Sequence, residues 1–318
     1  MAETGTDILK AKVLLEAGEL VAIPTETVYG LAGNALNTAA VAKIFAVKNR
    51  PQFDPLIVHV YDIQQVNNYV TDIPEKARLL AENFWPGPLT LLLKKQSIIP
   101  DLVTAGLDTV GIRCPKHALT QELLRSISFP LAAPSANPFG YVSPTRPEHV
   151  DGQLGNKIQY ILDGGSCEVG IESTIVGFED GNPIVYRMGG LSIEAIEAVI
   201  GKVRLQSHSA SNPKSPGQLK SHYAPRKKVI IGRIEDLLQQ YPAHCAGLLT
   251  FQKDFNSPYQ FILSPSGTLE EAAQNLFTGL HAFDKMPIEV ILTEMVPDNG
   301  LGRAINDRLR RAAASENP

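Results

Sequence analysis

Hydrophobic residues in the first part of the chain recur at helical spacing in some segments and in short apolar runs in others. Helical spacing predicts a helix over 6–17, which Gly18 ends. The apolar run at 20–24 ends in a proline and predicts a buried strand. A helix is expected over 38–50, with Thr38 as its N-cap. By the same criteria a helix is expected at 117–127, and strands at 55–62, 90–95, 109–115, 130–137, 158–165, 174–179 and 183–190.

A change of pattern marks a second domain. Residues 206–225 are rich in Ser, Pro, Gly, Asn and Lys and lack hydrophobic periodicity, which predicts a linker. Residues 1–205 are expected to form an α/β domain with a twisted mixed sheet, and residues 226–318 a smaller Rossmann-like α/β domain. In this second domain strands are expected at 228–232, 246–251, 260–264 and 289–295, and helices at 235–241, 268–283 and 301–313.

Composition narrows the possible functions. The chain has 318 residues and a formal net charge of -4, whereas domains that grip long nucleic acids are usually strongly basic. Its three cysteines, Cys114, Cys167 and Cys245, are widely spaced and form no CxxC pair, which disfavours a disulfide framework or a cysteine zinc site. No segment is typical of a signal peptide or a membrane span. We therefore expect a cytoplasmic protein with no membrane partner.

The first candidate site is the segment PTETVYGLAGN at 24–34, which follows a predicted strand directly. Polar side chains at a strand end, here including Glu26 and Thr27, commonly form binding sites in open sheets. Its glycines permit close backbone approach. The segment has no GK[ST] and so is not a Walker A loop. A polar turn without a further role is the alternative.

The second candidate is the segment 48–60. Lys48 and Arg50 end a predicted helix, and Asp54 lies in a loop that two prolines make rigid. Two cations and a carboxylate suit a polyphosphate with its metal, although cations also favour the end of a helix for electrostatic reasons alone. His59 lies in a predicted strand, where a lone histidine is more often structural than functional.

Other polar residues stand in unusual settings. Arg113 lies within an apolar strand and needs an anion, because an unpaired buried charge is costly. A substrate carboxylate and an internal salt bridge would serve equally. Ser135, Asn137 and Ser143 lie in a loop shaped by proline and glycine, which suits hydrogen bonding to phosphate or nucleoside, or a simple turn. Ser173 and Arg187 flank predicted strands, and each is a weak signal alone.

The predicted linker belongs to a basic stretch. Residues 198–234 contain no Asp or Glu although the chain is net acidic, which indicates contact with an anion or a solvated linker. Tyr223 precedes Ala-Pro here, an odd choice for a solvated tether.

Together these segments resemble the YrdC-like family of threonylcarbamoyl-AMP synthases. The motifs are PTETVYGLAGNA, the KxR pair at 48–50, the SxN pair at 135–137 and GIESTIV. SPGQLKSHYAP, followed by a second α/β domain ending in GLGRAINDRLRRAA, resembles the long form of the family with its extra C-terminal domain. The resemblance covers nearly the whole chain. It departs at residues 218–221, because the long-form motif often reads SPGMKYRHYAP.

The resemblance implies a nucleotidyltransferase that converts L-threonine, bicarbonate or CO2, and ATP with Mg2+ into L-threonylcarbamoyl-AMP and pyrophosphate. Separate enzymes would transfer the threonylcarbamoyl group to tRNA adenosine, so tRNA is only an indirect partner. The linker would close over the site, and no residue is expected as a direct metal ligand. Carried onto this sequence, the resemblance implies catalytic roles for Lys48 and Arg50, threonine binding by Thr27, His59, Arg113 and Ser173, and ATP binding by Lys48, Arg50, Asp54, Thr109, Ser135, Asn137, Ser143, Arg187 and Tyr223.

Two other functions compete with this interpretation. An RNA-binding module is disfavoured by the net charge of -4 and an aromatic content of only 7%. A carbamoyl-transfer enzyme of the hydrogenase-maturation type contains a similar domain, but such chains are longer and carry zinc-binding cysteine pairs that this sequence lacks.

Overall fold

The computed structural model describes residues 1–206 and 223–314, and their strands form two sheets. The strands of the first sheet are β1 (Glu3–Gly5), β2 (Val21–Ile23), β3 (Gly30–Asn34), β4 (Ile57–His59), β5 (Leu89–Lys94), β6 (Thr109–Arg113), β7 (Leu131–Ala132), β8 (Tyr160–Leu162), β9 (Thr174–Glu179), β10 (Asn182–Arg187) and β11 (Arg204–Leu205). They lie in the order β1-β8-β2-β3-β7-β4-β6-β5-β9-β10-β11. Parallel pairs such as β4·β6 and antiparallel pairs such as β5·β6 are both present. The mixed sheet expected from the sequence is therefore confirmed.

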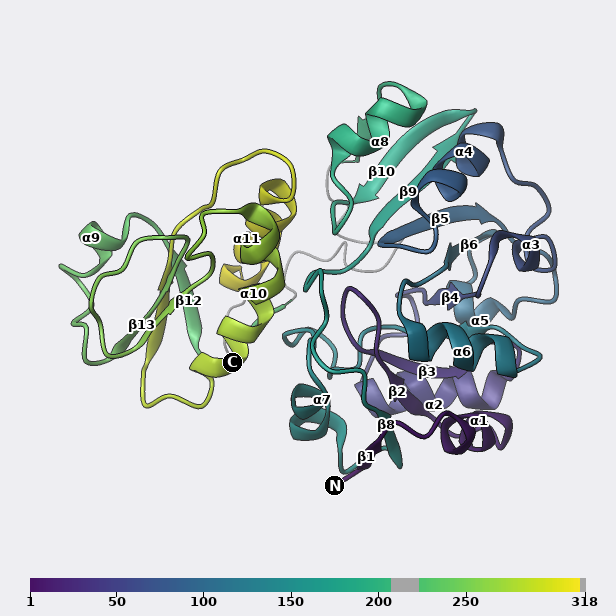
Figure 1. The fold of residues 1–318 in the computed structure, drawn as a ribbon, viewed down its shortest axis with the longest axis horizontal. Helices are drawn as coiled ribbons and strands as arrows, with labels where there is room; N and C mark the ends of the chain where they lie inside the picture. Colours follow the sequence, from purple (N-terminus) through teal and green to yellow (C-terminus); the bar gives the residue numbers. More distant parts are fainter. Residues whose placement is uncertain (207–222, 315–318) are drawn as a thin grey trace.

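Helices cover the first sheet in two layers (Figure 1). They are α1 (Ile8–Glu16), α2 (Thr38–Lys48), α3 (Ile63–Val66), α4 (Glu75–Phe84), α5 (Asp101–Thr104), α6 (Ala118–Ser126), α7 (Pro147–Leu154) and α8 (Ile193–Ile200). The main core packs α2, α4 and α8 against one face through Ile44, Leu80 and Ile196, which are fully buried. A second cluster packs α1 and α6 on β2 and β8.

The opposite face of strands β4 to β10 carries a smaller apolar cluster and the polar side chains discussed below. Side chains alternate between faces along a strand. Val110 and Ile112 of β6 belong to the main core, so Thr109, Gly111 and Arg113 point to the other face. The cluster on this face contains Ile57, Leu92, Ile175, Ile184 and Tyr186.

Residues 228–313 form a separate α/β unit. Its strands β12 (Lys228–Ile231), β13 (Ala246–Thr250), β14 (Gln260–Ile262) and β15 (Val290–Thr293) make a parallel sheet in the order β12-β15-β13-β14, and its helices are α9 (Ile234–Leu237), α10 (Leu269–Phe283) and α11 (Gly302–Ala313). Helices α10 and α11 lie on the side toward the first sheet (Figure 1). Among the helices in the described ranges, none has the length and apolar character needed to span a membrane.

The segment 24–34 is more ordered than the polar turn considered from the sequence. Its second half forms β3, which pairs with β2 in antiparallel fashion. A Cβ on Gly33 would lie 2.9 Å from Leu20 Cδ2 and 3.3 Å from Ile44 Cδ1, so glycine allows α2 to pack closely on this strand. A smaller correction concerns α2, whose N-cap is Asn37 rather than Thr38.

The predicted linker, residues 206–225, lies mostly outside the described residues. The last residues of this segment pack against both the first domain and the second α/β unit. Tyr223 is buried, and the Ala224 backbone N–H donates to the Gly140 carbonyl at 2.9 Å. The first sheet extends to Leu205 because β11 pairs with β10.

Candidate active site

A cavity of about 50 Å³ opens where several strands of the first sheet end. His59 ends β4 and Arg113 ends the parallel strand β6, and the two residues are register partners. The ends of parallel strands meet at one edge, which is a common location for binding sites. The cavity is lined by Val28, Arg50, Ile57, His59, Arg113, Ala133, Pro134, Ser135, Glu172, Arg187 and Tyr223.

Arg113 has an internal partner that the sequence analysis did not assign. Arg113 Nη2 lies 2.8 Å from Glu26 Oε1 and also donates a hydrogen bond to Thr27 Oγ1 at 2.8 Å. Glu26 also accepts from the Lys116 backbone N–H. Of the two partners considered for Arg113, the internal salt bridge is therefore present. Arg113 Nε is buried and has no hydrogen-bond partner among the described residues, so it remains available to a substrate anion.

His59 lies beside Arg113 as a buried, neutral side chain. Its Nδ1 is 3.2 Å from the Ile57 carbonyl. Burial, aided by the positive charge of Arg113, lowers the pKa of His59 to about 3. At neutral pH the imidazole therefore carries no charge and can both donate and accept a hydrogen bond.

Arg50 reaches the cavity, whereas Asp54 stands behind it. Arg50 donates to the carbonyls of Asp54 and Pro55 at 3.0 and 2.8 Å, and its Nη2 is 3.0 Å from Asp54 Oδ2. Burial raises the pKa of Asp54, although Arg50 and Lys48 oppose this shift. Asp54 is not part of the cavity wall. Asp54 therefore orients Arg50 from behind, and its contact with ATP, expected from the sequence, stays a prediction.

Lys48 is also withdrawn from the cavity. Its side chain is buried, and Nζ donates to the backbone carbonyls of Ser135 and Asn137. Burial, and then the neighbouring Arg50, lower the pKa of Lys48 well below its usual value. In this structure Lys48 holds the loop that presents Ser135 to the cavity. The catalytic role expected for Lys48 stays a prediction.

Asn137 has a similar supporting position. Its Nδ2 donates to the carbonyls of Pro138 and Tyr141, both at 2.8 Å, and it does not line the cavity. Its buried Oδ1 has no hydrogen-bond partner within the described part of the chain. Asn137 thus shapes the loop between Ser135 and Ser143 rather than contacting the cavity directly.

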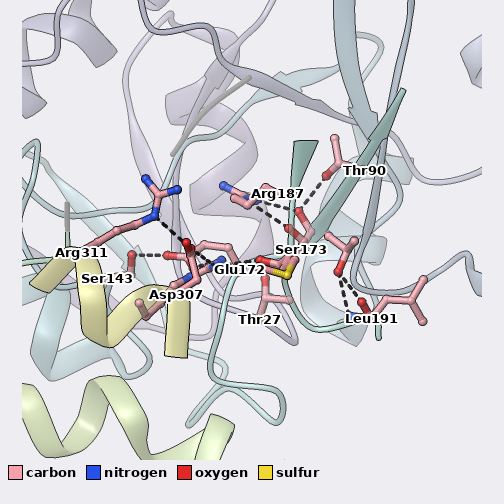
Figure 2. Close-up of polar contacts among 12 residues, drawn as sticks. Thr27, Thr90, Ser143, Glu172, Ser173, Arg187, Leu191, Asp307 and Arg311 are labelled. Carbon is pink, nitrogen blue, oxygen red and sulfur yellow. Dashed lines mark hydrogen bonds and ion pairs between the residues drawn. The ribbon is translucent and has the colours of Figure 1, made fainter. Parts of the chain in front are cut away.

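Ser173 and Arg187 form one hydrogen-bonded group with Thr90, a residue that the sequence analysis did not single out (Figure 2). Arg187 Nε donates to the Ser173 carbonyl at 3.0 Å, and Nη2 donates to Ser173 Oγ at 3.0 Å. The Ser173 hydroxyl is 2.8 Å from Thr90 Oγ1. The β5·β9 pairing brings Thr90 beside Ile175, which explains how residues so distant in sequence meet.

Glu172 connects the predicted loop to the cavity wall (Figure 2). Ser143 Oγ donates to Glu172 Oε1 at 2.6 Å, so Ser143 reaches the site through this carboxylate. Burial alone would raise the pKa of Glu172, but Arg308, Arg187 and the Ser143 hydroxyl outweigh it and lower that pKa. Glu172 is therefore a buried anion in the wall of a cationic cavity.

Comparison with known proteins identifies the family. One family model, described as "Telomere recombination", matches residues 13–189, and another, described as "Threonylcarbamoyl-AMP synthase, C-terminal domain", matches residues 191–314. The threonylcarbamoyl-AMP synthases of Bacillus subtilis and Pyrococcus abyssi are 42% and 40% identical to the chain, over 96% and 94% of its length and 92% of each relative. The chain belongs to the threonylcarbamoyl-AMP synthase family.

A solved structure of this synthase family has the same fold over both domains. The crystal structure of P. abyssi Sua5 complexed with L-threonine matches with a TM-score of 0.93 and 39% sequence identity. The match covers 98% of this chain and 97% of that one. The family resemblance and the fold class expected from the sequence are therefore both confirmed.

Thr109, a predicted ATP-binding residue, lies outside the arginine-lined cavity. It shares a sheet face with Arg113 but lies four residues away, or about 13 Å along the strand. It lines a second, open cavity of about 820 Å³, whose wall also contains Leu92, Gly177 and Tyr186. The structure thus separates Thr109 from the arginine-lined cavity while keeping both on one face of the sheet.

The synthase offers few carboxylates for a metal ion. No group of three or more His, Cys, Asp or Glu side chains suited to a metal occurs in residues 1–206 and 223–314. Of the two carboxylates nearest the phosphate-binding candidates, Asp54 pairs with Arg50 and Glu172 with Arg308. A cage of protein ligands is therefore not formed by these residues.

Proposed function

We infer that this chain makes L-threonylcarbamoyl-AMP from L-threonine, bicarbonate or CO2, and ATP, and releases pyrophosphate. The observation that carries this inference is the convergence of Arg50, Arg113 and Arg187 on one buried cavity in a chain of this family. Guanidinium groups bind carboxylates and phosphates through paired, charge-assisted hydrogen bonds. The substrates together present one carboxylate and one triphosphate, which these cations match.

The threonine end of the site is assigned to Arg113 and its neighbours. The free Nε of Arg113 suits the amino-acid carboxylate. Thr27 contacts Arg113 directly, and neutral His59 lies beside it in the sheet, so both can pair with the substrate hydroxyl. Ser173 immediately precedes β9 and contacts Thr90 and the wall residue Arg187, so it would support the polar wall from behind.

The ATP end is assigned to Arg50, Arg187 and Ser135, which line the same cavity. The second cavity on this sheet face would take the nucleoside. Its lining includes four acidic residues (Asp72, Asp108, Glu179 and Asp180), one lysine (Lys94) and Thr109, so its net negative charge disfavours phosphates and favours an uncharged group. The triphosphate would therefore lie toward the arginines, with the nucleoside extending along the sheet toward Thr109.

The chemistry requires no nucleophile from the protein. The threonine amine attacks CO2 to give a carbamate, and a carbamate oxygen then attacks the α-phosphorus, so that pyrophosphate leaves. The protein contributes positioning and neutralisation of the developing negative charge. Arg113 would hold the carboxylate so that the amine faces the phosphates bound by Arg50 and Arg187.

Mg2+ would enter with ATP. It prefers phosphate oxygens and water to a cage of protein carboxylates, which agrees with the ion-paired state of Asp54 and Glu172. The ion would neutralise triphosphate charge when bound.

The arginine-lined cavity must widen to receive substrates. Its volume of about 50 Å³ is well below the roughly 300–1,000 Å³ of ordinary ligand pockets. Tyr223, at the end of the predicted linker, forms part of its wall. We propose that Tyr223 moves away to admit ATP and returns to exclude water from the short-lived carbamate.

Pyrophosphate release tests this function. The full-length chain should release pyrophosphate from ATP only when L-threonine and bicarbonate are both supplied, and mass spectrometry should detect threonylcarbamoyl-AMP. Release that is independent of threonine would contradict the proposal.

The product would be used by a separate enzyme that modifies tRNA adenosine. A cytoplasmic location suits this role, and the free cysteines Cys114, Cys167 and Cys245 are compatible with a reducing compartment. A gel-shift titration with tRNA at several salt concentrations should show no tight complex with this chain alone.

A further inference from the structure

Arg308 of helix α11 is a buried charge at the junction of the two domains. Its side chain has no solvent exposure. Its Nε and Nη2 donate to Glu172 Oε2 at 3.1 and 3.0 Å, and Nη1 donates to the Met188 carbonyl at 2.7 Å. Both partners belong to the first domain. A guanidinium from the second domain thus makes three hydrogen bonds across the junction.

The position of Arg308 is fixed from its own helix. Asp307 Oδ2 accepts from Arg308 Nη1 at 3.1 Å and from Arg311 Nε at 2.9 Å. Figure 2 shows Asp307 and Arg311 beside Glu172 and Ser143 of the first domain. Helix α11 therefore presents an ordered group of charges to the back of the cavity wall.

Arg308 also contacts Tyr223. Its guanidinium carbon is 5.1 Å from the centre of the Tyr223 ring, within the range of a cation–π contact. On the second domain's side, Tyr223 stacks with Phe277 at 5.6 Å between ring centres. Two members of the cavity wall, Glu172 and Tyr223, are thus held by one side chain that does not itself line the cavity.

We propose that Arg308 is a positioning residue for the ATP end of the site, so that docking of the second domain completes the site. This inference rests on the proposed function. Glu172 places a negative charge where a triphosphate must bind, and Arg308 compensates that charge from behind. Through Glu172 it also fixes Ser143, and through its ring contact it stabilises the closed position of Tyr223.

The test compares variants of the full-length chain by their kinetics of pyrophosphate release. Arg308→Met leaves Glu172 buried without its main counter-charge and should raise KM for ATP by about tenfold or more. KM for threonine should change much less, because the Arg113 group does not contact Arg308. Changing Glu172→Gln in the same chain removes the uncompensated charge. The double variant should therefore reverse more than half of the increase in the logarithm of KM for ATP.

Arg303→Met is the matched control. Arg303 lies on the same helix and pairs across the same junction with Glu194 at 3.1 Å, but this pair is partly exposed and remote from the cavity wall. Its kinetic constants should stay within about twofold of wild type. Equal behaviour of the Arg308 and Arg303 variants, or no recovery in the double variant, would overturn the proposal.

Two other results, a variant that does not fold and a wild-type chain without activity, each call for a different measurement. If Arg308→Met does not fold, Arg308→Lys replaces it. Lysine keeps the charge but not the forked geometry and should raise KM for ATP by about threefold, so an unchanged KM would overturn the proposal. If the wild-type chain releases no threonine-dependent pyrophosphate, the proposed function fails first. Arg308 would then be judged by whether its substitution still weakens binding of ATP itself, measured calorimetrically.

Discussion

At the scale of single residues, burial decides which cations can meet a substrate. Lys48 and Arg50 are neighbours in the same motif, yet Arg50 lines the cavity and Lys48 holds two backbone carbonyls behind it. Substitution should therefore affect the two residues differently. Under the proposed function Arg50 would act on the ligand, whereas Lys48 acts on the shape of the loop from Ser135 to Ser143.

Lys48→Met should lower the free energy of unfolding by about 2–5 kcal/mol, because two buried carbonyls lose a charged donor. Urea unfolding measures this change. The control is Lys43→Met on the same helix, where Lys43 pairs with Glu19 and donates to the Gly18 carbonyl near the surface, so that its loss should cost no more than about 1 kcal/mol. Equal stability of both variants and wild type would show that Lys48 does not support the loop.

Amino-acid choice is a second prediction at this scale. With Arg113 on the carboxylate and His59 and Thr27 near the hydroxyl, threonine should be preferred strongly over valine, because a site built for a hydroxyl rejects analogues that lack it by about 10⁴-fold. Serine keeps the hydroxyl and loses one methyl group, so it should fall between them. Relative kcat/KM from pyrophosphate release provides the measurement. Similar values for threonine and valine would refute the hydroxyl pocket.

The sequence made some site residues visible and hid others for a physical reason. Arg113 stands out because a charge within an apolar strand needs an anion. Thr90 and Glu172 do not stand out, and the pairing of Glu26 with Arg113 was not assigned, because their importance lies in partners far along the chain. Arg308, the partner of Glu172, is 136 residues away. Local pattern cannot reveal such pairings.

At the scale of elements, the longer helices and strands were predictable and the short ones less so. Helix α10 and strands β6 and β13 fall within the expected ranges, and β5 begins one residue before its range, because their hydrophobic period is sustained. Strand β3 was missed because two glycines and a polar beginning resemble a turn, while burial against α2 makes it a strand. Helices α3, α4, α5, α7 and α8 were not predicted. The expected helix at 235–241 contracts to the single turn of α9.

Gly170→Ala should disturb the contact between the first domain and α10. A Cβ there would lie 2.4 Å from Gln274 Cα, so the helix backbone must shift, at a cost of about 1–3 kcal/mol beyond the backbone strain. Gly106→Ala is the control, because its φ of +78° matches the +77° of Gly170 while nothing lies within 4 Å. Thermal unfolding of both variants should show the larger loss for Gly170. Equal losses would mean that backbone strain alone is responsible.

At the scale of the whole molecule, a histidine pair makes the domain junction sensitive to acid. His149 of α7 and His281 of α10 stack at 4.0 Å between ring centres, and His281 Nε2 is 3.1 Å from the Ser143 carbonyl. Burial lowers the pKa of His149 to about 3, aided by His281, Arg146 and Lys285. Burial and Lys285 lower that of His281 to about 4, although the contact with Ser143 opposes the shift.

Stability should therefore fall as the pH drops below about 6.5, because the unfolded chain takes up protons that the folded pair resists. The loss is at most about 1.4 kcal/mol per pH unit for each histidine, and less for partly exposed His149. His149→Phe keeps a ring in the stack and should flatten the dependence of the thermal midpoint on pH between 7 and 5. His244→Gln, on an exposed histidine of the second domain, should not. Parallel pH profiles for wild type and His149→Phe would refute this role.

The ion pair between Glu172 and Arg308 also bears on how such a protein can evolve. A guanidinium supplied by one domain balances a carboxylate in the other. A substitution that removes the charge at either position therefore leaves a buried, unpaired charge at the other, which is destabilising. A second domain exchanged for one from an unrelated protein would be joined by the tether yet would leave Glu172 uncompensated. In chains that carry both domains, the two are thus expected to change as a matched pair rather than as interchangeable modules.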